Sequence, residues 1–286
     1  MPDTNVTLRL LISCEDRPGI VAAVSGYLAE SGANIVRSDQ YSTELGGGDF
    51  FMRIELTLPS GSYASFAEGF GMTVAEPLHL TWRLWDAARP KRVAILVSRM
   101  DQCLLELLWR WRRRELDADI VLVASNHENL RADVEGFFSL PYYYVPVPKD
   151  GKPEAEAKLL ELLEGNCDLV VLARYMQILS GDFLEKVGVP VINIHHSFLP
   201  AFAGASPYAQ ARERGVKLIG ATAHYVTEEL DAGPIIEQDV VRVSHRDGIA
   251  ALTREGGYVE RAVLARAVQL HCEDRVLRNG NTTVVF

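Results

Sequence analysis

Hydrophobic and polar positions alternate along the first 85 residues in a pattern that predicts strands and helices in turn. Val6–Cys14 alternates and is rich in β-forming residues, so it predicts a strand. Apolar residues then recur at helical spacing between Pro18, which favours a helix start, and Gly32, which favours a helix end. Further elements are expected at Asn34–Thr43, Asp49–Leu58, Tyr63–Phe70 and Leu78–Leu84. The order βαββαβ indicates a ferredoxin-like arrangement.

The pattern changes after the polar connector Ala87–Arg92. Strands now alternate with helices, which favours a parallel sheet with right-handed crossovers. Strands are expected at Arg92–Val97, Ile120–Ala124, Tyr143–Val147, Leu169–Ala173, Val189–Ile194, Leu218–Val226, Ile235–Val243 and Thr282–Phe286. Helices are expected at Gln102–Arg114, Asn129–Phe137, Pro153–Glu164, Pro207–Arg214 and Asp247–Cys272. The predicted fold class is α/β, with a ferredoxin-like domain at 1–86 and a Rossmann-like, mostly parallel-sheet domain at 87–286.

The amino-acid composition of the chain excludes some classes of binding partner. The chain has 286 residues and a formal net charge of −9, which argues against nucleic acid because phosphate binding needs a basic face. Its four cysteines lie far apart without a C-x-x-C pair, so neither a disulfide framework nor a zinc site is expected. We find no signal peptide and no apolar run of about 18 residues. The sequence therefore predicts a cytoplasmic protein without a membrane or nucleic-acid partner.

The first candidate catalytic residues lie where a predicted buried apolar strand ends in polar residues. Asn193 and His195 are two positions apart, so their side chains leave an extended backbone from one face. Ligands bind at the carboxyl ends of strands in open α/β sheets. An amide donor beside an imidazole suits a carbonyl whose oxygen becomes an oxyanion. The alternative is that the two side chains merely cap a loop, and spacing alone leaves both interpretations open.

Asp231 is the third candidate. Gly233 and Pro234 follow it closely, which predicts a rigidly held loop. A carboxylate beside His195 would orient the imidazole ring, raise its basicity and accept a proton from water. The alternative is a turn-forming aspartate with a local structural role.

Two further histidines lie near these positions. His196 alternates with His195 on the predicted strand, so it is expected to point away and to be structural. His224 either contacts the loop of Asp231 or packs in the core. No carboxylate or thiol completes a zinc site around these histidines, so we expect neither a metal nor a cofactor.

Three motifs in order carry a family resemblance. N-I-H-x-S-x-L-P begins at Asn193, G-x-T-x-H-x-V at Gly220 and D-x-G-x-I-I at Asp231. Together they resemble the folate-dependent formyltransferase family over about Arg92 to Phe286. The resemblance implies that Asn193, His195 and Asp231 are catalytic. It also implies that folate binds at Arg174, Tyr175, Met176, Gln177, Ile178, Leu179 and Gly233. Simple core packing is the alternative for that segment, and we expect Met176, Ile178 and Leu179 to serve both purposes.

The first domain carries a second resemblance. D-R-P-G-I-V at Asp16–Val21 and the later Gly32-Ala33-Asn34-Ile35 are similar to an ACT domain, a regulatory amino-acid-binding fold. This implies that a small amino acid such as glycine or methionine binds at Asp16, Gly19, Ile20 and Asn34. A lone unit of this type leaves a sheet edge unpaired, so a homo-oligomer is expected. The alternative is that the domain serves only to assemble that oligomer.

An ACT domain in front of a formyltransferase-like domain is similar to the deformylase branch of that family. The resemblance implies hydrolysis of 10-formyltetrahydrofolate to formate and tetrahydrofolate, supplying one-carbon and purine metabolism. Formyl transfer to an amine such as glycinamide ribonucleotide is the alternative, and it needs a glycine-rich phosphate cradle. Ser98–Leu105 follows the first strand of the second domain without a glycine, although Arg99 alone could bind a phosphate. A non-catalytic amino-acid sensor is the third possibility, and the intact catalytic trio argues against it.

One segment departs from the family pattern. Where the family carries G-R-D-V-E, this chain has Gly256-Gly257-Tyr258-Val259-Glu260. Two adjacent glycines weaken a helix, which puts the local structure in question.

Overall fold

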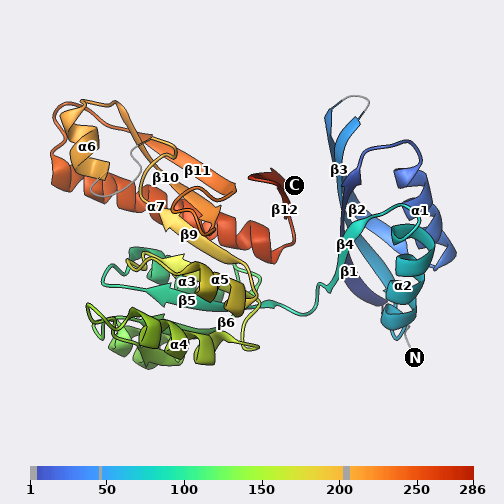
Figure 1. The fold of residues 1–286 in the computed structure, drawn as a ribbon, viewed down its shortest axis with the longest axis horizontal. Helices are drawn as coiled ribbons and strands as arrows, with labels where there is room; N and C mark the ends of the chain where they lie inside the picture. Colours follow the sequence, from blue (N-terminus) through green and yellow to red (C-terminus); the bar gives the residue numbers. More distant parts are fainter. Residues whose placement is uncertain (1–4, 45–46, 202–206) are drawn as a thin grey trace. The chain divides into compact units, whose positions relative to one another are not determined.

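The computed structural model describes residues 5–44, 47–201 and 207–286. The chain forms two compact units (Figure 1). Unit 1 contains Met1–Pro90 together with Glu273–Phe286, and unit 2 contains Lys91–Cys272. The chain therefore leaves unit 1, builds the whole of unit 2, and returns to unit 1 at its end.

Unit 1 has an antiparallel sheet in the order β2-β3-β1-β4, with helices on one face, as Figure 1 shows. Its first elements are β1 (Asn5–Glu15), α1 (Ile20–Glu30), β2 (Asn34–Glu44), β3 (Gly47–Pro59), α2 (Tyr63–Phe70), the π-helical turn η1 (Gly71–Ala75) and β4 (Thr81–Asp86). Alternate β1 side chains such as Leu10 and Ile12 pack against Val24 and Phe70 from the helices. The predicted βαββαβ order is confirmed. Strand β4 begins later than predicted because the amide of Leu78 still donates to Val74 in the helical turn.

The opposite face of this sheet is covered by the end of the chain. Strands β12 (Val276–Asn279) and β13 (Thr282–Val285) form a hairpin, and Leu277 packs against Leu11 and Phe51. Asp274 is buried and lies 3.0 Å from Arg83, within ion-pair distance. The hairpin thus closes the second face of the sheet in unit 1.

Unit 2 is built on a sheet in the order β11-β10-β9-β8-β5-β6-β7. Its strands are β5 (Lys91–Val97), β6 (Ala118–Ser125), β7 (Tyr142–Tyr144), β8 (Leu169–Ala173), β9 (Val191–His195), β10 (Leu218–Tyr225) and β11 (Ile235–Arg242). Its helices are α3 (Gln102–Arg112), the π-helical η2 (Ala132–Phe137), α4 (Lys152–Leu163), α5 (Gly181–Val187), α6 (Pro207–Glu213) and α7 (Ile249–Cys272). Strands β5 to β9 pair in parallel, and β10 and β11 are antiparallel, so the predicted mostly parallel sheet is confirmed.

The strand order creates a crevice at one edge of this sheet. From β5 the chain first builds β6 and β7 on one side, and then returns to place β8 and β9 on the other. Connections that leave neighbouring strands in opposite directions open a ligand crevice at the carboxyl ends of those strands. The loops after β5, β8 and β9 all begin at this edge.

Two local features of unit 2 differ from the sequence expectations. Helix α5 was not predicted; it is seven residues long and is capped by Ser180, whose Oγ accepts a hydrogen bond from the amide of Phe183. Helix α7 runs without a break through Gly256 and Gly257. Among the described residues, no helix has the length and apolar character needed to cross a membrane.

Candidate active site

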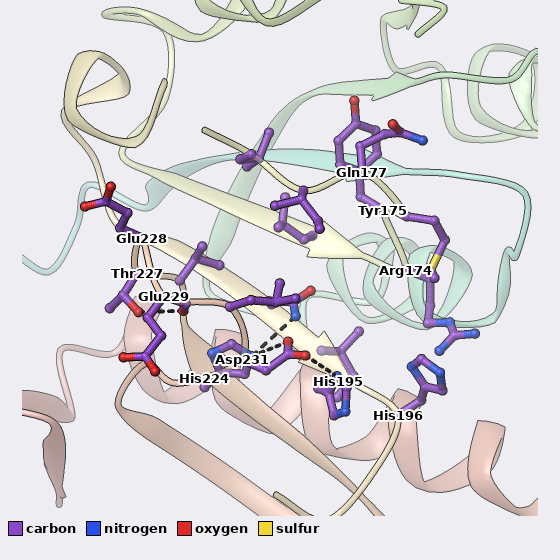
Figure 2. A pocket seen from close by; sticks show the side chains of 18 residues that line it. Arg174, Tyr175, Gln177, His195, His196, His224, Thr227, Glu228, Glu229 and Asp231 are labelled. Atoms are coloured by element: carbon purple, nitrogen blue, oxygen red, sulfur yellow. Dashed lines mark hydrogen bonds and ion pairs between the residues drawn. The ribbon is translucent and has the colours of Figure 1, made fainter. Parts of the chain in front are cut away.

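A cavity of about 580 Å³ opens at the carboxyl edge of the sheet in unit 2. Three segments line most of it: 174–179 after β8, 193–196 at the end of β9, and 226–231 after β10 (Figure 2). A volume of this size fits a cofactor-sized organic molecule. The crevice expected from the strand order is therefore where the candidate residues gather.

Asn193 and His195 both line the cavity, as their shared strand face requires. Strand β10 pairs beside β9 in a register that sets His224 opposite Asn193. The Nδ2 atom of Asn193 lies 3.3 Å from Nε2 of His224. The contact with His224 thus fixes the side-chain amide of Asn193, and Asn193 lines the cavity.

Asp231 comes to this strand pair from the loop after β10. Its Oδ2 lies 3.3 Å from Nδ1 of His195, and its Oδ1 lies 3.8 Å from Nε2 of His224. The hydrogen bond with His195 lowers the pKa of Asp231 and outweighs the opposing effect of burial, so the carboxylate stays ionised. Its backbone has φ of 55°, in a region that aspartate tolerates better than most residues.

The contact with Asp231 also defines the chemistry of His195. Because Nδ1 faces the carboxylate, Nδ1 is assigned as the protonated nitrogen. The other nitrogen, Nε2, is buried and has no hydrogen-bond partner among the described residues. It is therefore the atom that can accept a proton from, or donate one to, a molecule in the cavity.

The two other histidines also line this cavity. His224 combines the two interpretations left open above, because it is buried and its Nε2 lies 3.8 Å from Oδ1 of Asp231, and burial lowers its pKa. The expectation that His196 points away from His195 was wrong. Strand β9 ends at His195, so alternation no longer applies, and the ring centroid of His196 lies 5.2 Å from that of His195. Burial, helped by the charge of Arg174, lowers the pKa of His196 to about 3, so its ring is neutral.

The segment after β8 supplies an apolar wall. Tyr175 and Leu179 are buried, whereas Met176 and Ile178 are 58% and 61% exposed at the rim, beside Gln177. Leu179 packs in the core as expected. The same expectation was wrong for Met176 and Ile178, which are exposed. Exposed apolar side chains at a cavity mouth suit a flat aromatic ligand.

Ser98, at the end of β5, fixes this segment and was missed by the sequence analysis. Its Oγ accepts a hydrogen bond from the amide of Met176 and donates one to Asn126, while its own amide donates to the carbonyl of Arg174. A single serine at a strand end gives no signal for such a role, because the partners come from distant loops.

Gly233 is placed behind the cavity wall and not among its lining residues. A Cβ atom at this position would lie 1.8 Å from the carbonyl oxygen of Tyr225. Glycine is therefore required here by the close approach of two backbone segments, and it sets the path of the Asp231 loop.

The candidate regulatory residues lie in unit 1. Gly19 is exposed and precedes α1 with φ of 99°, and the amide of Asp16 donates to the carbonyl of Gly48. Ile20 is buried in the core, so only its backbone could face a ligand. Asn34 is exposed at the start of β2. Asp16 and Gly19 thus share one turn, Ile20 follows it, and Asn34 opens another element.

Comparison with known proteins places both units in families. Residues 91–268 match the model of the formyl transferase family, and residues 8–59 match the ACT domain model. Fold and site together therefore define a formyltransferase-type enzyme with an ACT domain in front of it.

Relatives of nearly the same length narrow this class. Formyltetrahydrofolate deformylases of Mycobacterium bovis and Bacillus subtilis are 58% and 54% identical, each over 97% of this chain and over 90% and 93% of their own lengths. A solved formyltetrahydrofolate deformylase structure from Pseudomonas syringae pv. tomato superposes with a TM-score of 0.94 at 52% identity, covering 98% of this chain and 94% of that chain. The chain belongs to the formyltetrahydrofolate deformylase family.

Proposed function

We propose that this chain hydrolyses 10-formyltetrahydrofolate to formate and tetrahydrofolate. The observation that carries the proposal is the Asp231–His195 pair, whose free imidazole nitrogen is held beside Asn193 at a cavity of about 580 Å³. Membership in the deformylase family supports this substrate. The products would supply formate to one-carbon and purine metabolism.

The three side chains divide the reaction between them. Asn193 donates to the formyl oxygen the amide hydrogen that His224 does not accept, and a positioned donor of this kind lowers a barrier by about 3–4 kcal/mol. His195 Nε2 accepts a proton from water as the water oxygen bonds to the formyl carbon. Asp231 stabilises the imidazolium that forms, as a carboxylate does beside a catalytic histidine. The imidazolium hydrogen-bonds the oxyanion and then passes its proton to N10 as the C–N10 bond breaks. Formic acid leaves as formate and releases one proton.

We propose that these protein groups perform the hydrolysis without a resident cofactor or metal. In the described part of the chain, no cluster of three or more His, Cys, Asp or Glu side chains is arranged to hold a metal ion. Folate is proposed to bind against the wall formed by Arg174 to Leu179, with its flat ring beside Met176 and Ile178. Gly233 is proposed to contribute by shaping the adjacent loop.

The competing activity is formyl transfer to an amine. The turn after β5 has no glycine, and the hydroxyl of Ser98 is already engaged by Asn126 and Met176, which disfavours a phosphate cradle there. Incubation with 10-formyltetrahydrofolate, with and without glycinamide ribonucleotide, separates the possibilities. We expect equal formate release in both samples. Formyl loss only in the presence of the amine would identify a transferase, and no loss in either would identify a non-catalytic sensor.

We further propose that unit 1 binds a small amino acid, glycine or methionine, and joins copies of the chain into a homo-oligomer. Gly19 lies at the start of α1 in the same turn as Asp16, and the backbone amides of a helix start favour a carboxylate. Strand β2 lies at the sheet edge and exposes Val36 and Tyr41, which favours pairing with a second copy. Calorimetric titration with each amino acid tests the effector. No heat from either, with unchanged activity, would leave assembly as the supported role.

We propose that regulation belongs to residues 1–86 and catalysis to residues 87–286, and that the enzyme acts in the cytoplasm. The described cysteines form no disulfide, in keeping with a reducing compartment. Sedimentation of the full chain and of a Val36→Lys, Tyr41→Lys variant, which places charges on the exposed edge strand β2, tests the assembly role of that segment.

A further inference from the structure

Arg174 occupies an unusual position at the start of the segment that follows β8. Its backbone has φ of 63°, which costs free energy for a residue with a side chain and often marks a functional site. Its side chain is only 13% exposed, although arginine rarely lies so deep unless it is paired. Nε lies 3.5 Å from Oε2 of Glu260, which supplies a counter-charge. The fold therefore stabilises a strained backbone and a buried cation at one position.

Glu260 is itself fixed from two sides. This residue of α7 is buried, its Oε1 accepts a 2.6 Å hydrogen bond from the hydroxyl of Tyr208, and its Oε2 accepts one of 3.3 Å from Gln102. Tyr208 can reach it only because position 256 is glycine: a Cβ there would lie 2.0 Å from the tyrosine oxygen. Gly256 matches the first glycine of the family pattern, so the departure at Gly257 and Tyr258 leaves the glycine that this arrangement requires in place. Glu260 is the positioning residue of the Arg174 guanidinium.

The guanidinium still has unused hydrogen-bonding capacity. Its Nε and Nη1 atoms are buried and have no hydrogen-bond acceptor among the described residues. Within that part of the chain, three N–H groups of a charged side chain have no acceptor, and an unsatisfied buried charged donor is costly and calls for an explanation. Glu260 contributes an ion pair but no aligned hydrogen bond to these atoms.

The Arg174 side chain also lines the cavity that holds the proposed catalytic groups. Arg174 lines the cavity together with His195 and His196, and Figure 2 shows its guanidinium next to the His196 ring. The ring of His196 is neutral for the reasons given above, so it adds no positive charge. Among the described residues that line the cavity, Arg174 is the one arginine or lysine.

We propose that Arg174 is an anion-binding residue that holds the formate released by the reaction. The inference rests on the proposed function, because the reaction must create this anion in the same cavity. Formate is planar and offers two equivalent oxygens, which match two N–H groups of one guanidinium in a bidentate pair. It is also small enough to reach a cation that is almost wholly buried. The proposed ligand of Arg174 is therefore formate, which is smaller than the folate ring.

A carboxylate could also come from the glutamyl part of the folate substrate. That group is bulky, and the described site would have to admit it to a side chain that is 13% exposed. Formate therefore fits the burial of Arg174 better. A substrate analogue that lacks the glutamyl group, 10-formyltetrahydropteroate, distinguishes the two sources.

The test measures inhibition of turnover by sodium formate at constant ionic strength, with sodium chloride as the balancing salt. Arg174→Met should raise the formate inhibition constant by at least about tenfold, because a charge-assisted hydrogen bond is lost. Arg174→Lys should give an intermediate constant, since it keeps the charge but not the planar fork. Arg254→Met serves as the matched control, because that side chain is 62% exposed on α7, and its constant should equal that of the parent.

Equilibrium binding provides a second measurement that needs no turnover. The parent protein should broaden the ¹³C-formate resonance. If the Arg174→Met or Arg174→Lys variant does not broaden it, the assignment is supported. An unchanged inhibition constant in a folded Arg174→Met variant would overturn it, as would the absence of broadening by the parent. The Arg174→Met variant could also show a higher KM for 10-formyltetrahydrofolate but an unchanged KM for 10-formyltetrahydropteroate. That result would mean that Arg174 binds the glutamyl carboxylate of the substrate, and it would overturn the formate assignment. Formate binding without any folate turnover would instead contradict the proposed function alone.

Discussion

Oδ2 of Asp231 lies 3.3 Å from Nδ1 of His195, although His195 ends β9 and Asp231 lies in the loop after β10. The antiparallel register of β9 and β10 sets Thr222 opposite His195, and Gly233 lets the loop after β10 turn back against Tyr225. The result is an ionised carboxylate beside Nδ1 of an imidazole whose Nε2 has no hydrogen-bond partner among the described residues. This relationship carries most of the proposed mechanism.

Replacing Asp231 with Asn should reduce kcat by at least about 10²-fold and leave folate binding largely intact, because it removes the charge that stabilises the His195 imidazolium without a change of shape. Formate release and the dissociation constant for folate are the two measurements. Asp239→Asn is the matched control, since that carboxylate is paired with Arg266 on the exposed side of β11 and should leave kcat unchanged. Turnover of Asp231→Asn within a factor of a few of the parent would contradict the role of Asp231.

Asn193→Ala and His195→Ala should each reduce kcat by about 10²–10³-fold, the usual effect of losing an oxyanion donor. The double variant should lose less than the product of the two single effects, because both groups act on one oxygen. Single-turnover formate release from the four proteins measures this coupling. Losses that simply multiply would show that the two side chains act independently.

The pH dependence of stability should reflect His196. Burial first, and the charge of Arg174 second, lower its pKa from 6.5 to about 3, so the folded state keeps it neutral while the unfolded chain binds a proton below pH 6.5. The contribution of His196 to the free energy of unfolding is therefore fully present above pH 6.5, and it is lost as the pH falls toward 3. His224 is shifted in the same direction, so part of the loss persists without His196.

Urea unfolding at pH 7.5 and pH 5 measures this dependence. The midpoint of the parent should fall at the lower pH, and that of His196→Asn should fall by a smaller amount. Equal midpoints of the parent at the two pH values would show that His196 is not held neutral.

Two neighbouring glycines in α7 should respond oppositely to alanine. Gly257→Ala meets only Gln102 at 4.0 Å and should stabilise by up to about 1 kcal/mol through helix propensity. Gly256→Ala would displace Tyr208, and overpacking of this kind typically costs about 1–3 kcal/mol. Urea midpoints of the pair measure the difference at matched helix propensity. A shift of the same sign and size in both would show that Tyr208 does not need Gly256.

The sequence predicted the parts of this molecule that depend on local periodicity. The shared face of Asn193 and His195 follows from the two-residue repeat of a strand, and the order of strands and helices follows from hydrophobic spacing. His196 was misplaced because alternation ends where the strand ends, and a boundary of one residue decides that outcome. Helix α5 was missed because seven residues give too few turns to show a period.

Other features depend on contacts between distant segments. Ser98 organises the segment after β8 through hydrogen bonds to Met176 and Asn126, which no spacing along the chain reveals. Gly256 appeared to weaken a helix, yet it accommodates a tyrosine ring from α6. Such residues are explained only once packing has brought their partners together.

The central claim is that water attacks the formyl carbon of a folate bound at this cavity. Turnover of 10-formyltetrahydrofolate in H₂¹⁸O, without any amine acceptor and followed by mass spectrometry of formate, tests it most directly. The account predicts one ¹⁸O atom per formate released and an equal amount of tetrahydrofolate. Formate without the label, or no formate until an amine is added, would contradict it.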